Sequence, residues 1–105
     1  MILEIPVEIT AYTARPEETD STPTITASGQ TVRVGIIALS RDLEKEFNLK
    51  FGDMVELRGL GYFEFQDRMN KRMRHSVDIF MHNYDDAIRF GRKQGLLRLT
   101  QNLDR

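Results

Sequence analysis

Two aspartates, Asp67 and Asp78, are the residues whose type and spacing most directly indicate chemistry. They lie eleven positions apart (78 − 67), and each belongs to a short strand-like run. Asp78 stands among Val77, Ile79 and Phe80, so we expect its carboxyl group to be partly buried, which costs several kcal/mol unless it is compensated (~2–7 for a polar group). Two carboxyl groups in one cleft can divide their roles, one protonated and one ionised. Cleavage of a glycosidic bond needs such a pair, because the leaving oxygen must be protonated.

The same two acids also have a purely structural interpretation. Residues 68–74 hold four bases and no acid, namely Arg68, Lys71, Arg72 and Arg74. If arginines of this segment paired with Asp67 and Asp78, the carboxylates would only pin the connection between two strands. The residues alone leave both interpretations open, with the structural one favoured.

The basic segment itself raises the question of an anionic ligand. No aromatic residue is interleaved with its bases, and the whole chain has a formal charge of −1, so the pattern argues against a nucleic-acid partner. A solvated basic loop is the favoured interpretation. An anionic substrate stays open as the alternative, and Lys71 is therefore kept as a candidate substrate-binding residue.

Metal and thiol chemistry have little support in the sequence. His75 and His82 are the two histidines, and no third ligand accompanies them at a metal-binding spacing. The absence of cysteine excludes disulfides, a thiolate nucleophile and cysteine-based zinc sites. We expect no metal and no cofactor.

Length and composition indicate one soluble domain over residues 1–105, with a core from about 3 to 101. The chain has 105 residues, of which 40% are hydrophobic and 30% charged. No apolar run approaches the ~20 residues of a membrane span, and the alternating start MILEIPVEIT is unlike a signal-peptide core. The protein is therefore expected to be cytoplasmic, or exported after removal of a leader that preceded it. A monomer is expected.

Six strand-like segments must position the acids. The alternation of Leu3, Ile5, Val7 and Ile9 with polar residues predicts a half-buried strand over 3–13. The other strands are predicted at 32–39, 54–58, 62–66, 77–81 and 95–101. In the fourth strand Phe63 and Phe65 share a face, and continuing that period places Asp67 in the same core-facing row. In the fifth, Asp78 and Phe80 share the face opposite Val77, Ile79 and Met81.

Two helices and one long loop complete the expected elements. Ser40 is typical of an N-cap for a helix over 41–47, and Asn83 of one for a helix that ends before Gly91. Residues 14–31 lack a period and are rich in hydroxyl groups, which suits binding of a polyol such as a glycan; a mobile surface loop is the alternative. Six short strands favour a small closed barrel, since closure removes exposed edges, over an open α+β sheet.

Taken in order, these residues resemble the 3D (Asp-Asp-Asp) domain, a double-psi β-barrel related to membrane-bound lytic transglycosylase A and found in bacterial stationary-phase and cell-wall proteins. The resemblance covers about residues 7–99, and the spacing of eleven fits the family's last two aspartates. It rests on the runs Thr10-Ala11-Tyr12-Thr13, Thr26-Ala27-Ser28-Gly29, Ile37-Ala38, Phe51-Gly52, Gln66-Asp67, Val77-Asp78-Ile79 and Phe90-Gly91.

The resemblance implies a lytic transglycosylase-like enzyme that cleaves MurNAc–GlcNAc bonds in peptidoglycan. Asp78 would act first as the general acid toward the glycosidic oxygen and then as the base on the muramic acid C6 hydroxyl, giving a 1,6-anhydro product. Asp67 would assist electrostatically. Tyr12 and Thr13 would line the groove, with Ser28 as a further substrate-binding candidate. Such a function implies the cell envelope or the extracellular space as the location.

The sequence departs from the family pattern where the first aspartate follows the Ile-Ala strand. Here Leu39, Ser40 and Arg41 stand at that place, so Ser40 occupies the position of an acid, and Asp20 is proposed as a substitute polar group. Both Ser40 and Asp20 are candidate substrate-binding residues. Arg68 and Met69 follow Asp67 where the family usually has Thr-Gly. The alternative function is accordingly a non-catalytic, glycan-binding wall module, and a weaker one is a cytoplasmic module that binds protein or nucleic acid.

Overall fold

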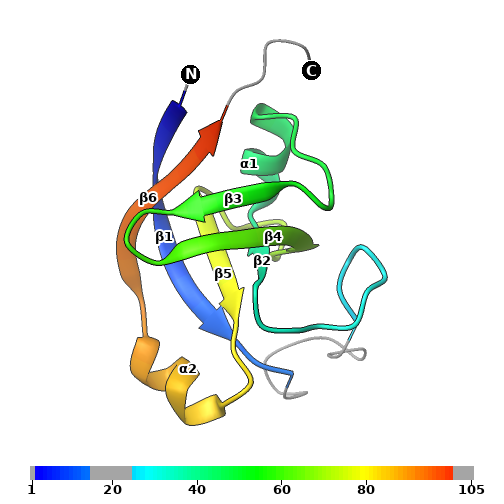
Figure 1. Ribbon diagram of the computed structural model, residues 1–105, viewed down its shortest axis with the longest axis vertical. Helices are drawn as coiled ribbons and strands as arrows, with labels where there is room; N and C mark the ends of the chain where they lie inside the picture. The colour runs from blue at the N-terminus through cyan, green and yellow to red at the C-terminus, as the bar shows by residue number, and fades with distance from the viewer. Residues whose placement is uncertain (1, 15–24, 101–105) are drawn as a thin grey trace.

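The structure, a computed structural model, describes residues 2–14 and 25–100. Within these residues the chain forms six strands and two short helices (Figure 1). In chain order the elements are β1 (Ile2–Tyr12), β2 (Ile36–Leu39), α1 (Arg41–Glu46), β3 (Met54–Leu57), β4 (Gly61–Arg68), β5 (Ser76–Phe80), α2 (Tyr84–Phe90) and β6 (Lys93–Thr100). The expected mainly β fold with two short helices is confirmed.

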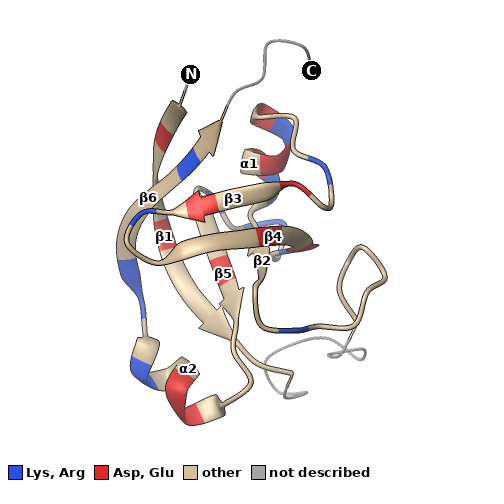
Figure 2. Cartoon of the chain, in the orientation of Figure 1, with Lys and Arg blue, Asp and Glu red and all other residues tan. Residues whose placement is uncertain are grey.

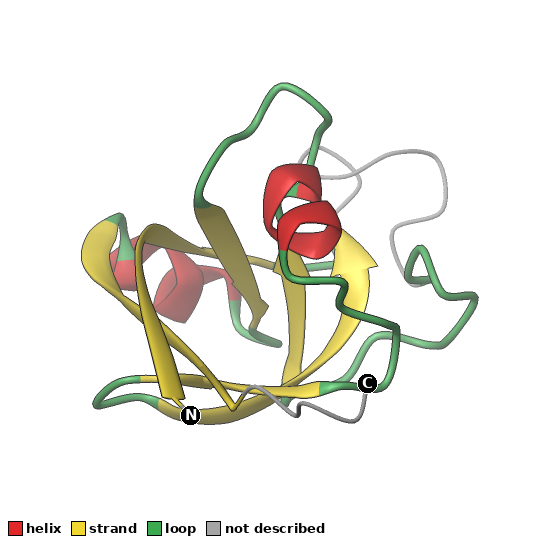
Figure 3. Ribbon diagram, turned by 90° about the horizontal axis from the view of Figure 1, so that it is seen from above, coloured by secondary structure: helices red, strands yellow, loops and turns green. Residues whose placement is uncertain are grey.

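The six strands close into one barrel in the order β1-β5-β2-β4-β3-β6, with β6 returning to β1. Figure 3, a view from above, shows the strands as the wall of this barrel. The β1–β5 and β2–β4 pairs are parallel, whereas the other neighbours are antiparallel. Closure leaves no long unpaired edge among the named strands, which answers the choice between a barrel and an open sheet.

The barrel interior holds the main hydrophobic core. Alternate residues of every strand point inward, because successive side chains of a strand face opposite sides. Leu43 of α1 is fully buried in the same core, so this helix covers one end of the barrel, while α2 lies toward the other end of the long axis (Figure 1). The buried members are Ile5, Val7, Ile9, Ile37, Leu39, Leu43, Leu49, Val55, Leu57, Phe65, Val77, Ile79, Leu97 and Leu99.

A second apolar cluster lies on the outer face of the wall, and we call it the outer cluster. It consists of Tyr12, Ala38, Met69 and Phe80, against which Ala14, Val32 and Met73 pack. Ala38 and Phe80 alternate with the inward-facing Ile37 and Ile79, so the cluster stands opposite the core. The expected separation of Asp78 and Phe80 from Val77 and Ile79 is confirmed.

A β-bulge in β4 overturns one expectation about Asp67. Ile37 pairs with Phe65, but the next residue of β2, Ala38, pairs with Asp67, so Gln66 is an extra residue. An extra residue reverses the side that the following side chains face. Asp67 therefore leaves the core-facing row of Phe65, where a regular period would place it, and joins the row of Ala38 on the outer face.

The strand β2 is also shorter than its sequence predicts. The expected strand began at residue 32, but the chain turns there, as the Ile36 amide donates to the Arg33 carbonyl (3.3 Å). Gly35 in this turn has φ +102°, a conformation that residues other than glycine rarely adopt.

The expected N-cap of α2 is confirmed, because Asn83 Oδ1 accepts a hydrogen bond from the Asp86 amide (3.0 Å).

Charged residues on the outer wall form cross-strand pairs. Arg98 of β6 lies between Glu4 of β1 and Glu56 of β3, with nitrogen–oxygen distances of 3.2 and 3.3 Å. Figure 2 shows the corresponding alternation of acidic and basic segments across β1, β6 and β3. Opposite charges across neighbouring strands stabilise the pairing modestly, by ~0.2–1 kcal/mol per pair.

Candidate functional site

The barrel brings Asp67 and Asp78 into one row across four strands. Thr10 of β1 pairs with Asp78 of β5, Asp78 pairs with Ala38 of β2, and Ala38 pairs with Asp67 of β4. The two acids thus flank Ala38 on the outer face, and two strand spacings put their Cα atoms about 10 Å apart. Ala38 between them is buried under the outer cluster, and the Tyr12 side chain reaches across to Asp67. We call Thr10, Asp78, Ala38 and Asp67 the acid row.

Three donors fix the carboxylate of Asp67. The Tyr12 hydroxyl donates to Oδ2 (3.0 Å), and the amides of Ala27 and Arg68 both donate to Oδ1 (2.9 Å each). The donors come from β1, from the loop after the first strand and from β4 itself. Three fixed donors hold the carboxylate in a single orientation, which suits a positioning and electrostatic role.

Asp78 is half-buried and is held from the neighbouring strand. The Thr10 hydroxyl lies 2.9 Å from Asp78 Oδ1 and 3.4 Å from the carbonyl oxygen of Val77. Thr10 faces Asp78 directly because β1 and β5 are parallel and in register at this point. A short β-branched side chain with few rotamers thus fixes the acid.

Tyr12 interacts with both acids, through a hydrogen bond to Asp67 and through the charge of Asp78. Burial raises the pKa of the Tyr12 hydroxyl above its ordinary value, and the charge of Asp67, the hydrogen bond to it and the charge of Asp78 act in the same direction. The phenol therefore stays neutral and keeps its proton for donation to Asp67. Its ring packs edge-on against Phe80 at 5.5 Å between centroids, which anchors it to the outer cluster.

The loop after the first strand contributes a backbone group to the site. Residues 26–30 form a tight turn in which the Thr26 amide donates to the Gln30 carbonyl (2.7 Å), and the hydroxyls of Thr26 and Ser28 are 2.8 Å apart. The Ser28 amide donates to the Gln66 carbonyl (3.2 Å) beside Asp67. Ser28 therefore lies next to the acid row. Asp20 lies outside the described residues.

Ser40 and Thr13 are placed in the interior of the fold. Both are buried, with 0% and 1% of their surface exposed. Ser40 Oγ accepts from the Ser76 amide (3.1 Å), and the Ser40 amide donates to the Ser76 carbonyl (2.9 Å), so this serine joins the end of β2 to the start of β5. Ser40 precedes α1 as expected, but its side chain caps no amide of that helix.

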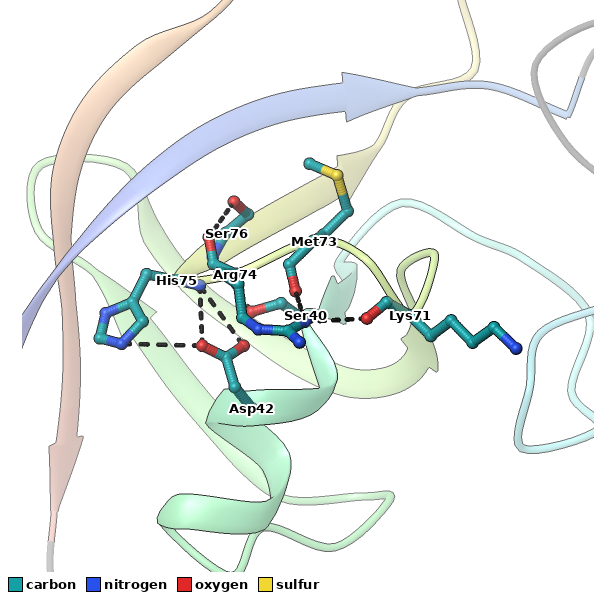
Figure 4. Close-up of polar contacts among 7 residues, drawn as sticks. All are labelled: Ser40, Asp42, Lys71, Met73, Arg74, His75 and Ser76. Carbon is teal, nitrogen blue, oxygen red and sulfur yellow. Dashed lines mark hydrogen bonds and ion pairs between the residues drawn. The ribbon is translucent and has the colours of Figure 1, made fainter.

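Asp42, two residues after Ser40, supports a strained turn (Figure 4). Its Oδ2 accepts from the His75 amide at 3.0 Å and lies 3.6 Å from His75 Nε2. His75 has φ +45°, an uncommon conformation for a residue other than glycine. Against the opposing effect of burial, hydrogen bonds from the Ser40 side chain and from the amides of His75 and Leu43 lower the pKa of Asp42.

The arginines near the acids bind other groups. Arg68 donates from Nε and Nη2 to the two carboxylate oxygens of Glu44 (2.7 and 2.8 Å), and its guanidinium lies over the ring of Phe51. Arg74 Nη1 donates to the carbonyls of Lys71 and Met73 (2.9 and 3.1 Å). The guanidinium groups of Arg68 and Arg74 therefore do not form the ion pairs with Asp67 and Asp78 that the structural interpretation required.

The sequence nominated the two acids, and the resemblance nominated Tyr12, but two of the groups that contact the acids were not predicted. Thr10 belongs to a run that carries the resemblance, but nothing in the sequence assigned it a role, and its partner lies 68 positions away. The Ala27 amide carries no side-chain signal at all.

Among residues 2–14 and 25–100, no group of three or more His, Cys, Asp or Glu side chains is arranged to hold a metal. No helix in the same residues is long and apolar enough to span a membrane.

Comparison with known proteins gives no family for the chain: no protein-family model matches it, and no curated protein matches it.

Proposed function

We propose that the protein is a lytic transglycosylase-like enzyme of the 3D-domain type that acts on peptidoglycan glycan strands. The observation that carries the proposal is the acid row, in which two aspartates from different strands face the same side across one alanine. The closed barrel with two parallel strand pairs agrees with a double-psi barrel, and the resemblance in residue order gives the substrate class.

In the proposed reaction Asp78 is the catalytic residue. In its protonated form it gives its proton to the glycosidic oxygen as the bond from C1 of MurNAc to that oxygen breaks, so the GlcNAc unit leaves as an alcohol. The Asp78 carboxylate then takes the proton from the C6 hydroxyl of the same MurNAc, whose oxygen bonds to C1. No water is consumed, and the aspartate ends in its starting protonation state.

The neighbouring residues have supporting roles in this mechanism. Asp67, held by Tyr12 and two amides, places a fixed negative charge near the positive charge that develops at the sugar ring. Thr10 positions the carboxyl group of Asp78.

The decisive experiment measures the release of 1,6-anhydro-muropeptides from purified sacculi by mass spectrometry. We expect release by the wild-type protein and a loss of about 100-fold or more in Asp78→Asn, because the amide has no proton suited to general acid catalysis. Asn has nearly the same shape as Asp, so the unfolding midpoint of the variant should stay close to that of the wild type. The proposal fails if the wild-type protein releases nothing.

A second candidate function, a glycan-binding module without activity, is favoured by Ser40. This residue stands where the family has its first acid, and it is fully buried and hydrogen-bonded to Ser76. In that case wild type and Asp78→Asn would co-sediment equally with sacculi, and neither would release product.

A further inference from the structure

The basic segment 68–74 is not a uniformly solvated loop, because two of its four bases have structural partners. Arg68 is paired with Glu44, and Arg74 folds back onto the carbonyls of Lys71 and Met73. Lys71 and Arg72 remain. Both are exposed, and no ion pair joins either to a carboxylate of the described residues.

A tight turn places these two cations at consecutive positions of the chain. The Met73 amide donates to the Asn70 carbonyl (2.9 Å), and the Arg72 amide donates to the Asn70 side chain (3.1 Å). Lys71 and Arg72 therefore occupy the two central positions of the turn. Figure 4 shows the Lys71 amino group extending away from Asp42 and the groups that surround it.

The turn is fastened beside the acid row. The Met69 amide donates to the Leu39 carbonyl (3.0 Å), and Met69 and Met73 pack into the outer cluster with Tyr12 and Ala38. Residues on both sides of the two cations are thus attached to the surface that carries Asp67 and Asp78. The conformation of the turn is further stabilised from within, because Arg74 donates hydrogen bonds to the carbonyls of Lys71 and Met73.

We infer that Lys71 and Arg72 form a subsite for a carboxylate of the peptide stems that the glycan strand carries. The inference rests on the proposed function. Stem peptides with free carboxylates are attached to muramic acid, so a strand with intact stems brings an anionic group close to each bond that Asp78 would cleave. Two adjacent exposed cations suit such a group, because a guanidinium and an ammonium both bind carboxylate oxygens. The subsite would select strands with intact stems and fix their register.

The test compares the binding of three proteins to sacculi from which teichoic acids have been removed. The proteins are the wild type, Lys71→Gln/Arg72→Gln, and a control, Arg58→Gln/Arg89→Gln. The control also loses two positive charges, but at exposed positions whose carboxylate partners are Glu4 and Asp86. We expect the turn variant to bind about tenfold more weakly at low ionic strength, as for the loss of two surface ion pairs, and the control to bind like the wild type.

Two further arms identify the anionic group. On sacculi whose carboxylates have been converted to amides, the wild type and the turn variant should bind equally. High salt should also remove the difference, because exposed ion pairs are screened. Circular dichroism of the variants should match the wild type, because both residues are exposed in a turn.

Specific outcomes overturn the inference. It is wrong if both double variants weaken binding equally or if amidated sacculi still discriminate against the turn variant. It is also wrong if the difference is absent on the stripped sacculi and appears only on sacculi that keep their teichoic acids. The failure of this inference alone would leave wild-type release of anhydro-muropeptides intact, whereas failure of the proposed function would remove that release in every protein tested.

Discussion

At the scale of single residues, the contact between Thr10 and Asp78 sets how the proposed acid is aimed. The hydroxyl of Thr10 is 2.9 Å from Asp78 Oδ1, and Thr10 belongs to a neighbouring strand whose register is fixed by the barrel. The acid is therefore oriented by the fold and not by its own loop. Thr10 is a positioning residue, since it acts on the substrate only through Asp78.

Replacement of Thr10 by Val should lower the rate of anhydro-muropeptide release by about 10- to 100-fold, the effect of losing one hydrogen bond to a charged group (~1.5–3 kcal/mol). The loss should appear in kcat more than in KM, because binding of the strand does not depend on this hydroxyl. Thr10→Ser, which keeps the hydroxyl, should restore most of the rate. An unchanged kcat in Thr10→Val would show that Asp78 needs no support from β1.

Residue patterns also mark the limit of what the sequence could predict about the site. The alternation of side chains in β5 correctly predicted that Asp78 and Phe80 share one face. The same alternation in β4 assigned Asp67 to the wrong face, because Gln66 is an extra residue that interrupts it, and no local rule identifies Gln66 as that residue. The Ala27 amide and the Thr10 hydroxyl were missed because their partners are 40 and 68 positions away.

At the scale of elements, the β1–β6 pair depends on a residue without a side chain. Gly95 lies opposite Val7, and a Cβ built at this position would come within 2.5 Å of Ile9 Cδ1. Ile9 is buried in the core, so its side chain has little room to move. Gly95 thus permits close packing of the first and last strands, a use of glycine that requires no unusual backbone angle.

Gly95→Ala should lower the free energy of unfolding by ~1–3 kcal/mol, as overpacking does in a dense core. Ile9→Val removes the δ-methyl group in question and should by itself cost ~0.5–1.5 kcal/mol. Combined, the two changes should cost clearly less than their sum when measured by urea unfolding. Gln94→Ala, at an exposed neighbouring position, serves as the control and should stay within ~0.5 kcal/mol of the wild type. Additive costs in the double variant would contradict the proposed clash.

The elements themselves were largely predictable. The clean alternation in the first strand, the cap Asn83 and the count of short strands all led to the observed elements, and closure followed from the need to cover strand edges. The start of β2 was not predictable from its apolar residues. The turn at 33–36 depends on backbone hydrogen bonds and on the positive φ of Gly35, which outweigh the strand preference of the valines.

At the scale of the whole molecule, Asp42 couples folding stability to pH. Hydrogen bonds from Ser40, His75 and Leu43 overcome the effect of burial and lower the pKa of Asp42 below the ordinary value of 3.8. A carboxyl group whose pKa is lower in the folded state contributes stability above its unfolded-state pKa. It loses that contribution as the pH falls through the folded-state pKa.

Asp42→Asn should therefore be less stable than the wild type at pH 7, by ~1–2 kcal/mol, because the His75 amide and the strained turn lose their charged acceptor. The difference should shrink as the pH is lowered below 3.8, where the wild-type carboxylate also becomes protonated. Thermal unfolding followed across pH 2–7 would measure this, with Glu46→Gln as an exposed control that changes little. A difference that stays constant down to the lowest pH would assign the loss to something other than the charge.

The pairing of the outermost strands has a consequence for how the barrel can be built into larger proteins. Ile2 of β1 lies opposite Thr100 of β6, so the described chain enters and leaves the barrel at neighbouring points. A unit whose two junctions are adjacent can be spliced into a surface turn of a host protein with little cost in loop-closure entropy. The barrel could therefore be inserted as a unit, and the connections at Ile2 and Thr100 would set the orientation of its acid row relative to the host protein.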